Sequence, residues 1–179
     1  MVAGRPSKQL QILHAARELF SDFGYQGTSI DLVVQRAGVS KPTVYNHFNT
    51  KQELLQHLLK QLSQEASHYR EELSSKYQHG DINGLCASFR YITATPAHLA
   101  SYRILAGERF KLSDSLADDI GQLDRQHIEW CNQWLAPSVE TQTIELLISI
   151  CQSSLVYPAL MGSDLISDQA LRKRLRVHL

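Results

Sequence analysis

A short run of polar side chains between Lys41 and His47 has the composition and spacing to contact nucleic acid. If this run is helical, a turn of ~100° per residue places Thr43, Asn46 and His47 on one face. These side chains can exchange hydrogen bonds with base edges in a DNA major groove. Lys41 and Tyr45 flank that face and suit contact with phosphate. The alternative is an ordinary solvated surface, because polar residues on a short helix need no partner.

The opposite face of the same segment is apolar, as a helix packed on a core requires. Val44 and Phe48 lie together on this face at helical spacing. We expect both to pack inward against Leu32, Val33 and Val39 of the preceding segment. The polar side chains would then be held outward by a buried apolar face.

Capping residues predict the boundaries of the helices around this segment. Thr28 and Asp31 have the spacing of a capping box, so a helix should begin just after Thr28. Gly38 suits the left-handed conformation that ends a helix. Ser40 is a good N-cap, and Pro42 falls in the first turn of the next helix, where its missing amide hydrogen has no intrahelical partner. Two helices joined by a short turn that contains glycine form a helix-turn-helix.

A long helix should follow, since Thr50 and Glu53 form a second capping-box pair. The apolar pattern predicts that this helix reaches about Tyr77. Lys51 lies in its first turn, where free backbone amides favour anions such as phosphate.

The chain before the helix-turn-helix predicts a further helix, capped by Ser7 and ended by Gly24 and Gly27. Its apolar residues recur at the spacing of one buried stripe; they are Ile12, Leu13, Ala16, Leu19, Phe20 and Phe23. Arg5 precedes this helix in a short arm that is placed to enter a minor groove or touch phosphate. An unordered start of the chain is the alternative.

The residues from Ile12 to Leu55 resemble the DNA-binding domain of the TetR family of transcriptional regulators. The matching motifs are AARELF, the glycine-aromatic-x-x-Thr segment at Gly24–Thr28, AGVS, and TVYNHF followed by a lysine and two leucines. Pro42 departs from the family pattern, which more often has glycine or a small residue there. The DNA-binding residues expected from the helix and the resemblance together are Thr28, Lys41, Pro42, Thr43, Tyr45, Asn46, His47 and Lys51.

Composition is that of a soluble globular protein: of 179 residues, 43% are hydrophobic and 20% are charged. The formal net charge is zero, whereas DNA-binding proteins are usually basic. The charges are unevenly distributed, because residues 1–60 hold seven Lys and Arg against four Asp and Glu. The small basic excess therefore lies in the segment predicted to bind DNA.

The three cysteines, Cys86, Cys131 and Cys151, lack CxxC spacing and indicate neither a disulfide framework nor a zinc site. Buried, reduced thiols are expected, with a redox-sensing thiol as the alternative. No metal or cofactor is expected. The chain start lacks the apolar stretch of a signal peptide, and the apolar run 144–151 falls short of the ~18 residues of a membrane span, so we expect a cytoplasmic protein without a membrane partner.

The fold is predicted to be all-α, with a helix-turn-helix domain in residues 1–50 and a helical effector-binding and dimerisation domain in residues 51–179. Strand signals are weak throughout, and no linker separates the two domains. The helices expected in the second domain, after the long connecting helix, are 85–95, 97–110, 113–135, 138–162 and 164–179.

The helix predicted at 138–162 is apolar on two sides, which indicates a helix that is central to its domain or shared with a partner subunit. The resemblance implies that the last two helices pair with their symmetry mates in a four-helix bundle. The residues expected at this dimer interface are Leu146, Ile150, Tyr157, Met161, Leu171 and Leu175.

The functional hypothesis is a homodimeric repressor that binds a pseudo-palindromic double-stranded DNA operator and is released by a small-molecule effector. Two recognition helices related by a two-fold axis would read half-sites ~34 Å apart, or a multiple of that distance. Aromatic residues of the second domain are candidates for the effector site, with plain core packing as the alternative for each; they are Phe89, Tyr91, Tyr102, Trp130 and Trp134.

A regulator has two alternatives from other classes of function, an enzyme and an interaction module. The sequence lacks the G-x-S-x-G, P-loop, G-x-G-x-x-G and H-E-x-x-H motifs, so we do not expect an enzyme. A helical protein-interaction module without sequence-specific DNA binding is the remaining alternative, and the zero net charge is its best support.

Overall fold

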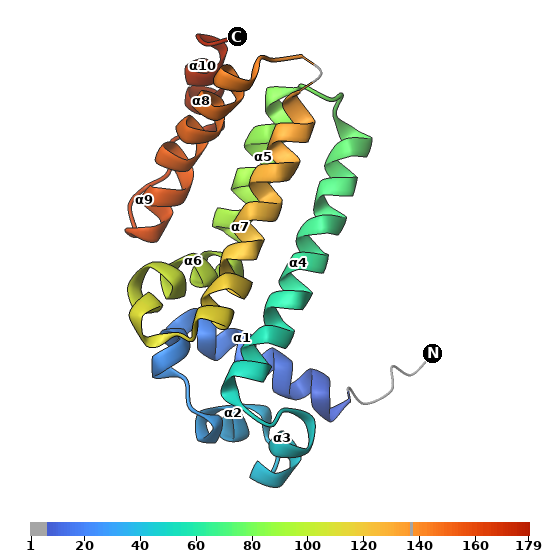
Figure 1. Cartoon of the computed structure of the whole chain (residues 1–179), viewed down its shortest axis with the longest axis vertical. Helices are drawn as coiled ribbons and strands as arrows, with labels where there is room; N and C mark the ends of the chain where they lie inside the picture. The colour runs from blue at the N-terminus through green and yellow to red at the C-terminus, as the bar shows by residue number, and fades with distance from the viewer. Residues whose placement is uncertain (1–6, 137) are drawn as a thin grey trace.

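The computed structural model describes residues 7–136 and 138–179, and every regular element among them is helical, as predicted. The N-terminal domain forms one end of an elongated molecule, and the remaining helices form a bundle that extends away from it (Figure 1). The helices of the N-terminal domain are α1 (Lys8–Gly27), α2 (Ile30–Ala37) and α3 (Lys41–His47).

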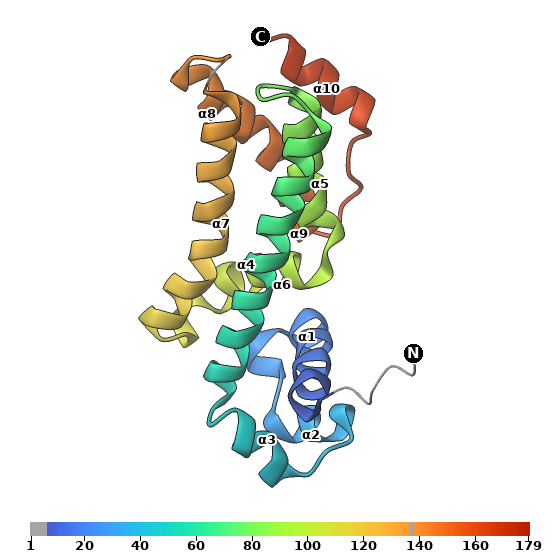
Figure 2. The same ribbon diagram turned by 90° about the vertical axis from the view of Figure 1, so that its right-hand side faces the viewer.

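The long helix α4 (Lys51–Lys76) runs from the N-terminal domain along the bundle and joins the two parts without a linker (Figure 2). It packs against α5 and α7, while α6 lies across the lower end of the bundle in contact with α1. The elements after α4 are α5 (Ile82–Ala94), α6 (Pro96–Glu108), a 3₁₀ turn (Arg109–Lys111), α7 (Asp114–Leu135), α8 (Thr141–Cys151), a π-helical segment (Gln152–Val156), α9 (Tyr157–Leu160) and α10 (Asp168–Arg176).

Two hydrophobic cores hold these helices together, as burial of apolar surface favours. The first contains Phe20, Val44 and Phe48 of the N-terminal domain, and it also contains Ile104 of α6 and Leu116 of α7. The two domains therefore share one core. The second core lies at the far end of the bundle, around residues of α5, α7, α8 and α10.

The end of α1 is kinked and held by α6. Gly24 has φ 70°, and a Cβ atom at this position would collide with the Glu108 carboxylate. That carboxylate accepts hydrogen bonds from the backbone amides of Tyr25, at 3.1 Å, and Gln26, at 2.7 Å. A side chain of the larger domain thus satisfies two amides of the N-terminal domain, and we call this contact the Glu108 clamp.

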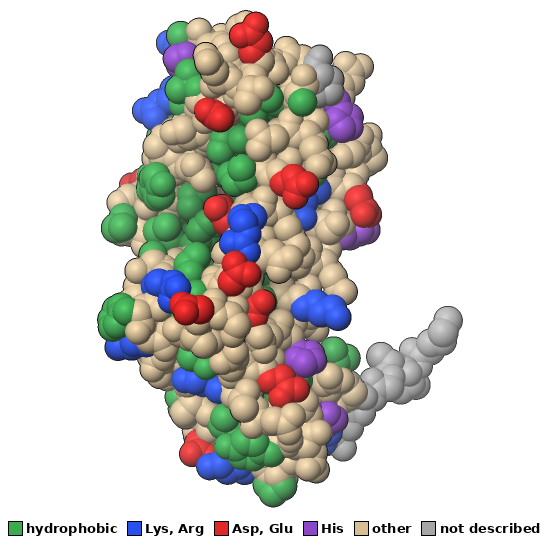
Figure 3. Space-filling model, in the orientation of Figure 1, with side chains coloured by type: hydrophobic (Ala, Val, Ile, Leu, Met, Phe, Trp, Pro, Cys, Tyr) green, Lys and Arg blue, Asp and Glu red, His purple; other side chains and the backbone are tan. Residues whose placement is uncertain are grey.

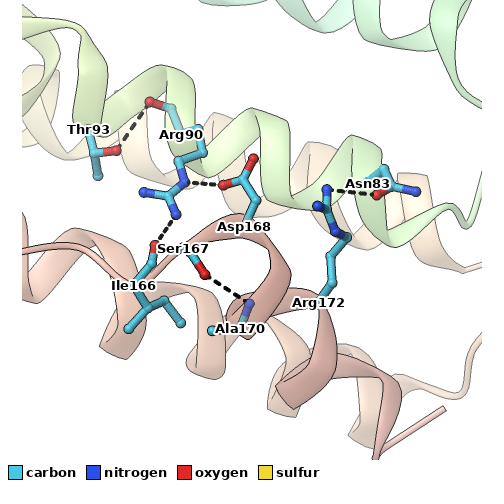
Figure 4. Close-up of polar contacts among 8 residues, drawn as sticks. All are labelled: Asn83, Arg90, Thr93, Ile166, Ser167, Asp168, Ala170 and Arg172. Carbon is cyan, nitrogen blue, oxygen red and sulfur yellow. Dashed lines mark hydrogen bonds and ion pairs between the residues drawn. The ribbon is translucent and has the colours of Figure 1, made fainter.

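The short last helix, α10, is anchored to α5 by polar contacts (Figure 4). Arg90 donates to Asp168 at 2.8 Å and to the carbonyl of Ile166. Arg172 donates to the side chain of Asn83 at 3.4 Å. The prediction that the last helix spans 164–179 was too long, because the chain is irregular from Gly162, with φ 68°, to the N-cap before Asp168.

The preceding helix continues to Leu160 through Pro158, a residue type that usually kinks or ends a helix. The segment Gln152–Val156 is π-helical, and Tyr157 N–H donates to the carbonyl of Gln152. This wider turn lies just ahead of Pro158. In a regular α-helix, the proline ring would clash with the carbonyl four residues earlier in the chain.

The run Thr141–Leu160 is consequently longer than the apolar stretch counted in the sequence. By length and composition alone, an 18-residue window of this run is able to cross a membrane, a test that the core helix of a soluble protein also passes. In the structure, 44% of that window is buried against the other helices. A helix with one buried and one exposed apolar side accounts for this composition.

Candidate nucleic-acid interface

The helix-turn-helix forms from the predicted turn residues. Gly38 adopts the left-handed conformation at φ 62° and ψ 38°, and ends α2. Ser40 caps α3, because its hydroxyl accepts from the amide of Thr43 at 3.2 Å. Pro42 lies in the first turn of α3, where no backbone donor is needed.

The cap of α2 was predicted one residue early. Ser29, not Thr28, accepts from the amide of Leu32, at 3.2 Å. The Thr28 side chain is 1% exposed, and its hydroxyl donates to the carbonyl of Gly24 at 2.8 Å. Including Thr28 among the side chains that contact DNA is therefore corrected, because the buried hydroxyl closes the end of α1.

The two faces of α3 lie as its sequence predicts. Val44 and Phe48 are fully buried in the first core. Tyr45, Asn46 and His47 are exposed, together with Lys41 and Pro42 at the start of the helix. Thr43 is half-buried, and its hydroxyl lies 2.7 Å from that of Ser40. These side chains form a continuous outward face, and contact with DNA remains their predicted role.

Lys51 is held by the protein itself. Its ammonium donates to the carbonyls of Tyr25, at 2.7 Å, and Thr28, at 3.0 Å, and lies 4.2 Å from the centre of the Tyr25 ring. Burial lowers the pKa of Lys51, with Glu108 opposing the shift. Two of its three donors are therefore occupied, so its first role is to hold the end of α1 against α4.

Two basic residues of the N-terminal domain are paired with acids of the same domain on its surface. Lys41 pairs with Asp31 at 2.8 Å, which raises the pKa of Lys41. Arg36 pairs with Glu18 at 2.8 Å. Strong attraction to phosphate thus depends on exchanging these exposed partners for DNA, since exposed pairs are weak. Arg5, the predicted arm residue, lies outside the described residues.

The predicted effector residues separate into two groups. Tyr91 and Tyr102 line an enclosed cavity between α4, α5, α6 and α7. Phe89 is buried in the second core. Trp130 and Trp134 stack with ring centres 4.9 Å apart and do not line this cavity.

Trp134 packs at the far end of the bundle. The indole N–H of Trp134 donates to the carbonyl of Asp81 at 2.9 Å. Gly84 leaves room for the Trp134 ring, which a Cβ at that position would strike. A tryptophan with a satisfied N–H and a shaped slot is a core residue.

Among the cavity residues that were not predicted from the sequence, three carry basic side chains: Arg70, His98 and His127. They come from three different helices, and only the packing of those helices brings them together. His98 follows Pro96 at the start of α6, but neither its spacing nor that of the other two residues signals a shared site. The Glu108 clamp was missed for the same reason.

The cysteines are all buried and unpaired with one another. Burial raises the pKa of Cys86 to about 11 and that of Cys131 to about 12, and it also raises the pKa of Cys151. A thiol that stays protonated reacts slowly, so the redox alternative receives no support from the structure.

The predicted dimer residues on α8 and α9 form an exposed apolar stripe. Tyr157 and Met161 are 57% and 80% exposed, Leu146 is exposed and Ile150 is half-buried. Hydrophobic side chains gather over the α8–α9 side of the molecule in Figure 3. We call these four residues the α8–α9 stripe.

Leu171 and Leu175 do not belong to this exposed surface. Both are fully buried in the second core, where α10 packs against α5 and α8 of its own chain. Assigning them to the dimer interface is therefore corrected. The physical reason is that a nine-residue helix has one apolar face, and that face is already covered.

Comparison with known proteins gives the N-terminal domain a clear family. Residues 12–58 match the sequence model of the family described as "Bacterial regulatory proteins, tetR family". The transcriptional activator FasR of Mycolicibacterium smegmatis is 48% identical over 50 residues, which are 28% of this chain and 23% of that protein. The uncharacterized regulator YhgD of Bacillus subtilis is 44% identical over 59 residues, which are 31% of each protein. The matched segment thus spans less than a third of either relative.

Solved structures extend the likeness to the whole fold. A TetR-family transcriptional regulator from Agrobacterium tumefaciens has a TM-score of 0.76 at 21% identity, and the likeness covers 95% of this chain and 96% of that one. A TetR transcriptional regulator from Legionella pneumophila has the same TM-score at 15% identity, covering 98% and 96%. Residues 12–58, which contain the helix-turn-helix, therefore match the DNA-binding domain of the tetR family of bacterial regulatory proteins, and the chain shares its overall fold with solved TetR-family regulators.

Proposed function

We propose that this DNA-binding regulator is a homodimeric repressor of a pseudo-palindromic operator and is released from it by a small-molecule effector. The observation that carries the proposal is the outward face of α3. Its apolar side is fixed in the core by Val44 and Phe48, while Tyr45, Asn46 and His47 are exposed. A rigidly mounted polar helix face is what base readout in a major groove requires.

The α8–α9 stripe supports the homodimer. Exposed apolar residues on one side of a helix favour a partner, and a second copy of the chain offers a self-complementary stripe across a two-fold axis. The stripe lies far from α3, toward the other end of the molecule (Figure 1). Two copies joined there would place two recognition helices on one DNA duplex.

Release by an effector is supported by the shared core and the Glu108 clamp. Both connect the helices that surround the enclosed cavity to the DNA-binding domain. A ligand that favours a different arrangement of these helices would change the spacing of the recognition helices and lower DNA affinity. Binding to chromosomal DNA also requires a cytoplasmic location.

Repression is the proposed direction of control, and the named relatives include both directions. FasR is described as an activator. KstR2 of Rhodococcus jostii, 23% identical over 136 residues, is described as a repressor, and that match covers 68% of this chain and 63% of KstR2. A reporter gene behind the bound site distinguishes the two, since loss of the protein should raise expression under repression.

Selection of duplexes from a random-sequence pool tests the DNA-binding part of the proposal. The purified protein should enrich a motif with two inverted half-sites, and an Asn46→Ala protein carried through in parallel should lose the base preference at one position of each half-site. Enrichment of no motif at low salt and without added ligand would contradict it, because the recognition face would then have no target.

A further inference from the structure

The enclosed cavity lies at the centre of the bundle, with walls from four helices. Its apolar and aromatic sides are formed by Ala66, Tyr69, Tyr91, Ile92, Tyr102 and Leu123. Tyr69 and Tyr91 stack with ring centres 4.3 Å apart. The volume is ≈ 10 Å³, which is room for about one water molecule. We call it the central cavity.

Two buried imidazole nitrogens at the central cavity have no hydrogen-bond partner among the described residues. They are the Nδ1 atoms of His98 and His127, whose side chains are almost wholly buried. Leaving such a buried atom unsatisfied is destabilising, so each one marks a position where a ligand could supply a hydrogen bond.

The hydrogen bonds of His127 determine what that partner must supply. Ser88 donates its hydroxyl hydrogen to the carbonyl of Leu85 at 2.8 Å, so at 3.1 Å it accepts from Nε2–H of His127. The neutral ring then has a lone pair on Nδ1. Burial lowers the pKa of His127 to about 3, which keeps this ring neutral. The missing partner of His127 is therefore a donor, such as a hydroxyl group.

Arg70 supplies a cation to the same cavity without an anion to pair with. Its guanidinium makes no ion pair or side-chain hydrogen bond with any described residue, and no Asp or Glu lines the cavity. Arg17 on α1 shows the usual arrangement in this protein, because its guanidinium binds both carboxylate oxygens of Glu65 at 2.6 and 2.7 Å. A half-buried arginine beside a cavity calls for a carboxylate from elsewhere.

From these contacts we infer that the central cavity binds a small aromatic carboxylic acid that carries a hydroxyl group. Arg70 binds its carboxylate, the Nδ1 atom of His127 accepts from its hydroxyl, and its ring packs among Tyr69, Tyr91 and Tyr102. Tyr102 is oriented for this packing, because its hydroxyl donates to Asp124 at 2.7 Å and is not free for the ligand.

Entry of such a ligand requires the central cavity to widen, since its present volume admits about one water molecule. Helix α6 carries His98 in its first turn and Glu108 at its end, ten residues and ~15 Å further along. A displacement of α6 by the ligand would therefore reach the Glu108 clamp. The ligand assignment rests on the proposed function, so its test measures ligand binding and DNA binding separately.

The probes are 2-, 3- and 4-hydroxybenzoate, each titrated into the full chain by calorimetry. At least one should bind, and 2-, 3- or 4-hydroxybenzamide of the same pattern should bind about tenfold or more weakly, because the amide lacks the charge that Arg70 recognises. Arg70→Gln should weaken the acid by a similar factor. Arg125→Gln is the matched control, since Arg125 is exposed and paired with Asp118 at 2.8 Å.

A nitrogen-15 spectrum of the histidine side chains tests the contact without a variant that might misfold. Binding of the acid should shift the Nδ1 signal of His127 toward that of a hydrogen-bonded nitrogen. Failure of all three acids to bind at millimolar concentration, or equal binding to the wild type and a folded Arg70→Gln protein, would overturn the ligand class and leave a water-filled cavity. Retained operator binding in that case would leave the regulator intact, whereas acid binding without any loss of operator affinity would support the ligand class and contradict effector release.

Discussion

Asn46 is the residue of α3 that we expect to read a base. It is exposed between Tyr45 and His47 on the outward face, and an amide side chain can form two hydrogen bonds to adenine. Asn46→Ala should weaken binding to the selected operator by ~1–3 kcal/mol and relax the preference at one position. Fluorescence anisotropy with single-base operator variants measures both effects. An equal loss on operator and random duplex would show that Asn46 only positions the protein.

Lys51 should matter more to folding than to DNA affinity. Because its ammonium binds the carbonyls of Tyr25 and Thr28, Lys51→Met should lower the free energy of unfolding by about 1 kcal/mol. A phosphate contact would additionally flatten the salt dependence of DNA binding by about one unit of slope. Urea unfolding and a salt titration separate the roles, with Lys60→Met, an exposed change on α4, as the control.

The two cavity histidines should make stability depend on pH. Burial lowers the pKa of His98 to about 4 and that of His127 to about 3, whereas both titrate near 6.5 in the unfolded chain. Below pH ~6.5 the unfolded state binds more protons than the folded state. The free energy of unfolding therefore decreases as the pH is lowered, by up to ~1.4 kcal/mol per pH unit for each histidine, until the pKa of the folded state is reached.

Urea unfolding at about pH 7 and about pH 5 measures this loss, in a window above most carboxylate titration. His98→Asn should reduce the loss by roughly half. His178→Asn, an exposed change after α10, is the control. Equal stability of the wild-type protein at the two pH values would contradict the burial of neutral imidazoles.

At the scale of single residues, the features that could be predicted from the sequence are those that depend on residues nearby in the chain. The left-handed Gly38 and the Ser40 cap followed from local chemistry and are confirmed. Local chemistry could not decide whether Thr28 or Ser29 caps α2, because two adjacent hydroxyls are equivalent until packing buries one of them. The partners of Lys51 and the other residues that line the cavity beside Arg70 come from distant segments, which spacing cannot reveal.

The Glu108 clamp joins α6 to α1 and is the element-scale contact most open to mutation. Glu108→Gln replaces one acceptor oxygen by an N–H₂ group that cannot accept from the amides of Tyr25 or Gln26. We expect it to lower the free energy of unfolding by about 1–2 kcal/mol and to speed hydrogen exchange at those two amides. Glu129→Gln, an exposed change on α7, is the matched control. Unchanged hydrogen exchange at both amides would show that the Glu108 clamp does not couple the two domains.

Helix boundaries show where pattern reasoning succeeds and where it fails. The ends of α3, α4 and α7 followed from capping residues and a strong apolar period, and they agree with the structure. The π-helical segment before Pro158 was not predicted, because a wider turn has no sequence signature and arises from packing. The length of α10 was overestimated, because the chain is irregular from Gly162 to the N-cap before Asp168 and the helix ends at Arg176.

For the whole molecule, the α8–α9 stripe predicts a dimer that one charge should separate. Tyr157→Asp places a carboxylate in the centre of the stripe, where pairing of two copies would bury it without a partner. Sedimentation should show a dimer for the wild type and a monomer for this variant. Phe110→Asp is the control, because Phe110 is 80% exposed on the 3₁₀ turn, away from the stripe. Dissociation by both variants, or by neither, would contradict the assigned interface.

Hydroxyl-radical footprinting of the selected operator tests most directly whether a dimer binds DNA through two α3 helices, since it shows the DNA protected by both recognition helices at once. We predict two protected patches on one face of the duplex, separated by ~34 Å or a multiple of it, with two chains bound per site. The Tyr157→Asp protein should lose both patches together at concentrations where the wild type is bound. A single patch, or uniform protection of operator and random DNA alike, would contradict a dimer that reads paired half-sites through α3.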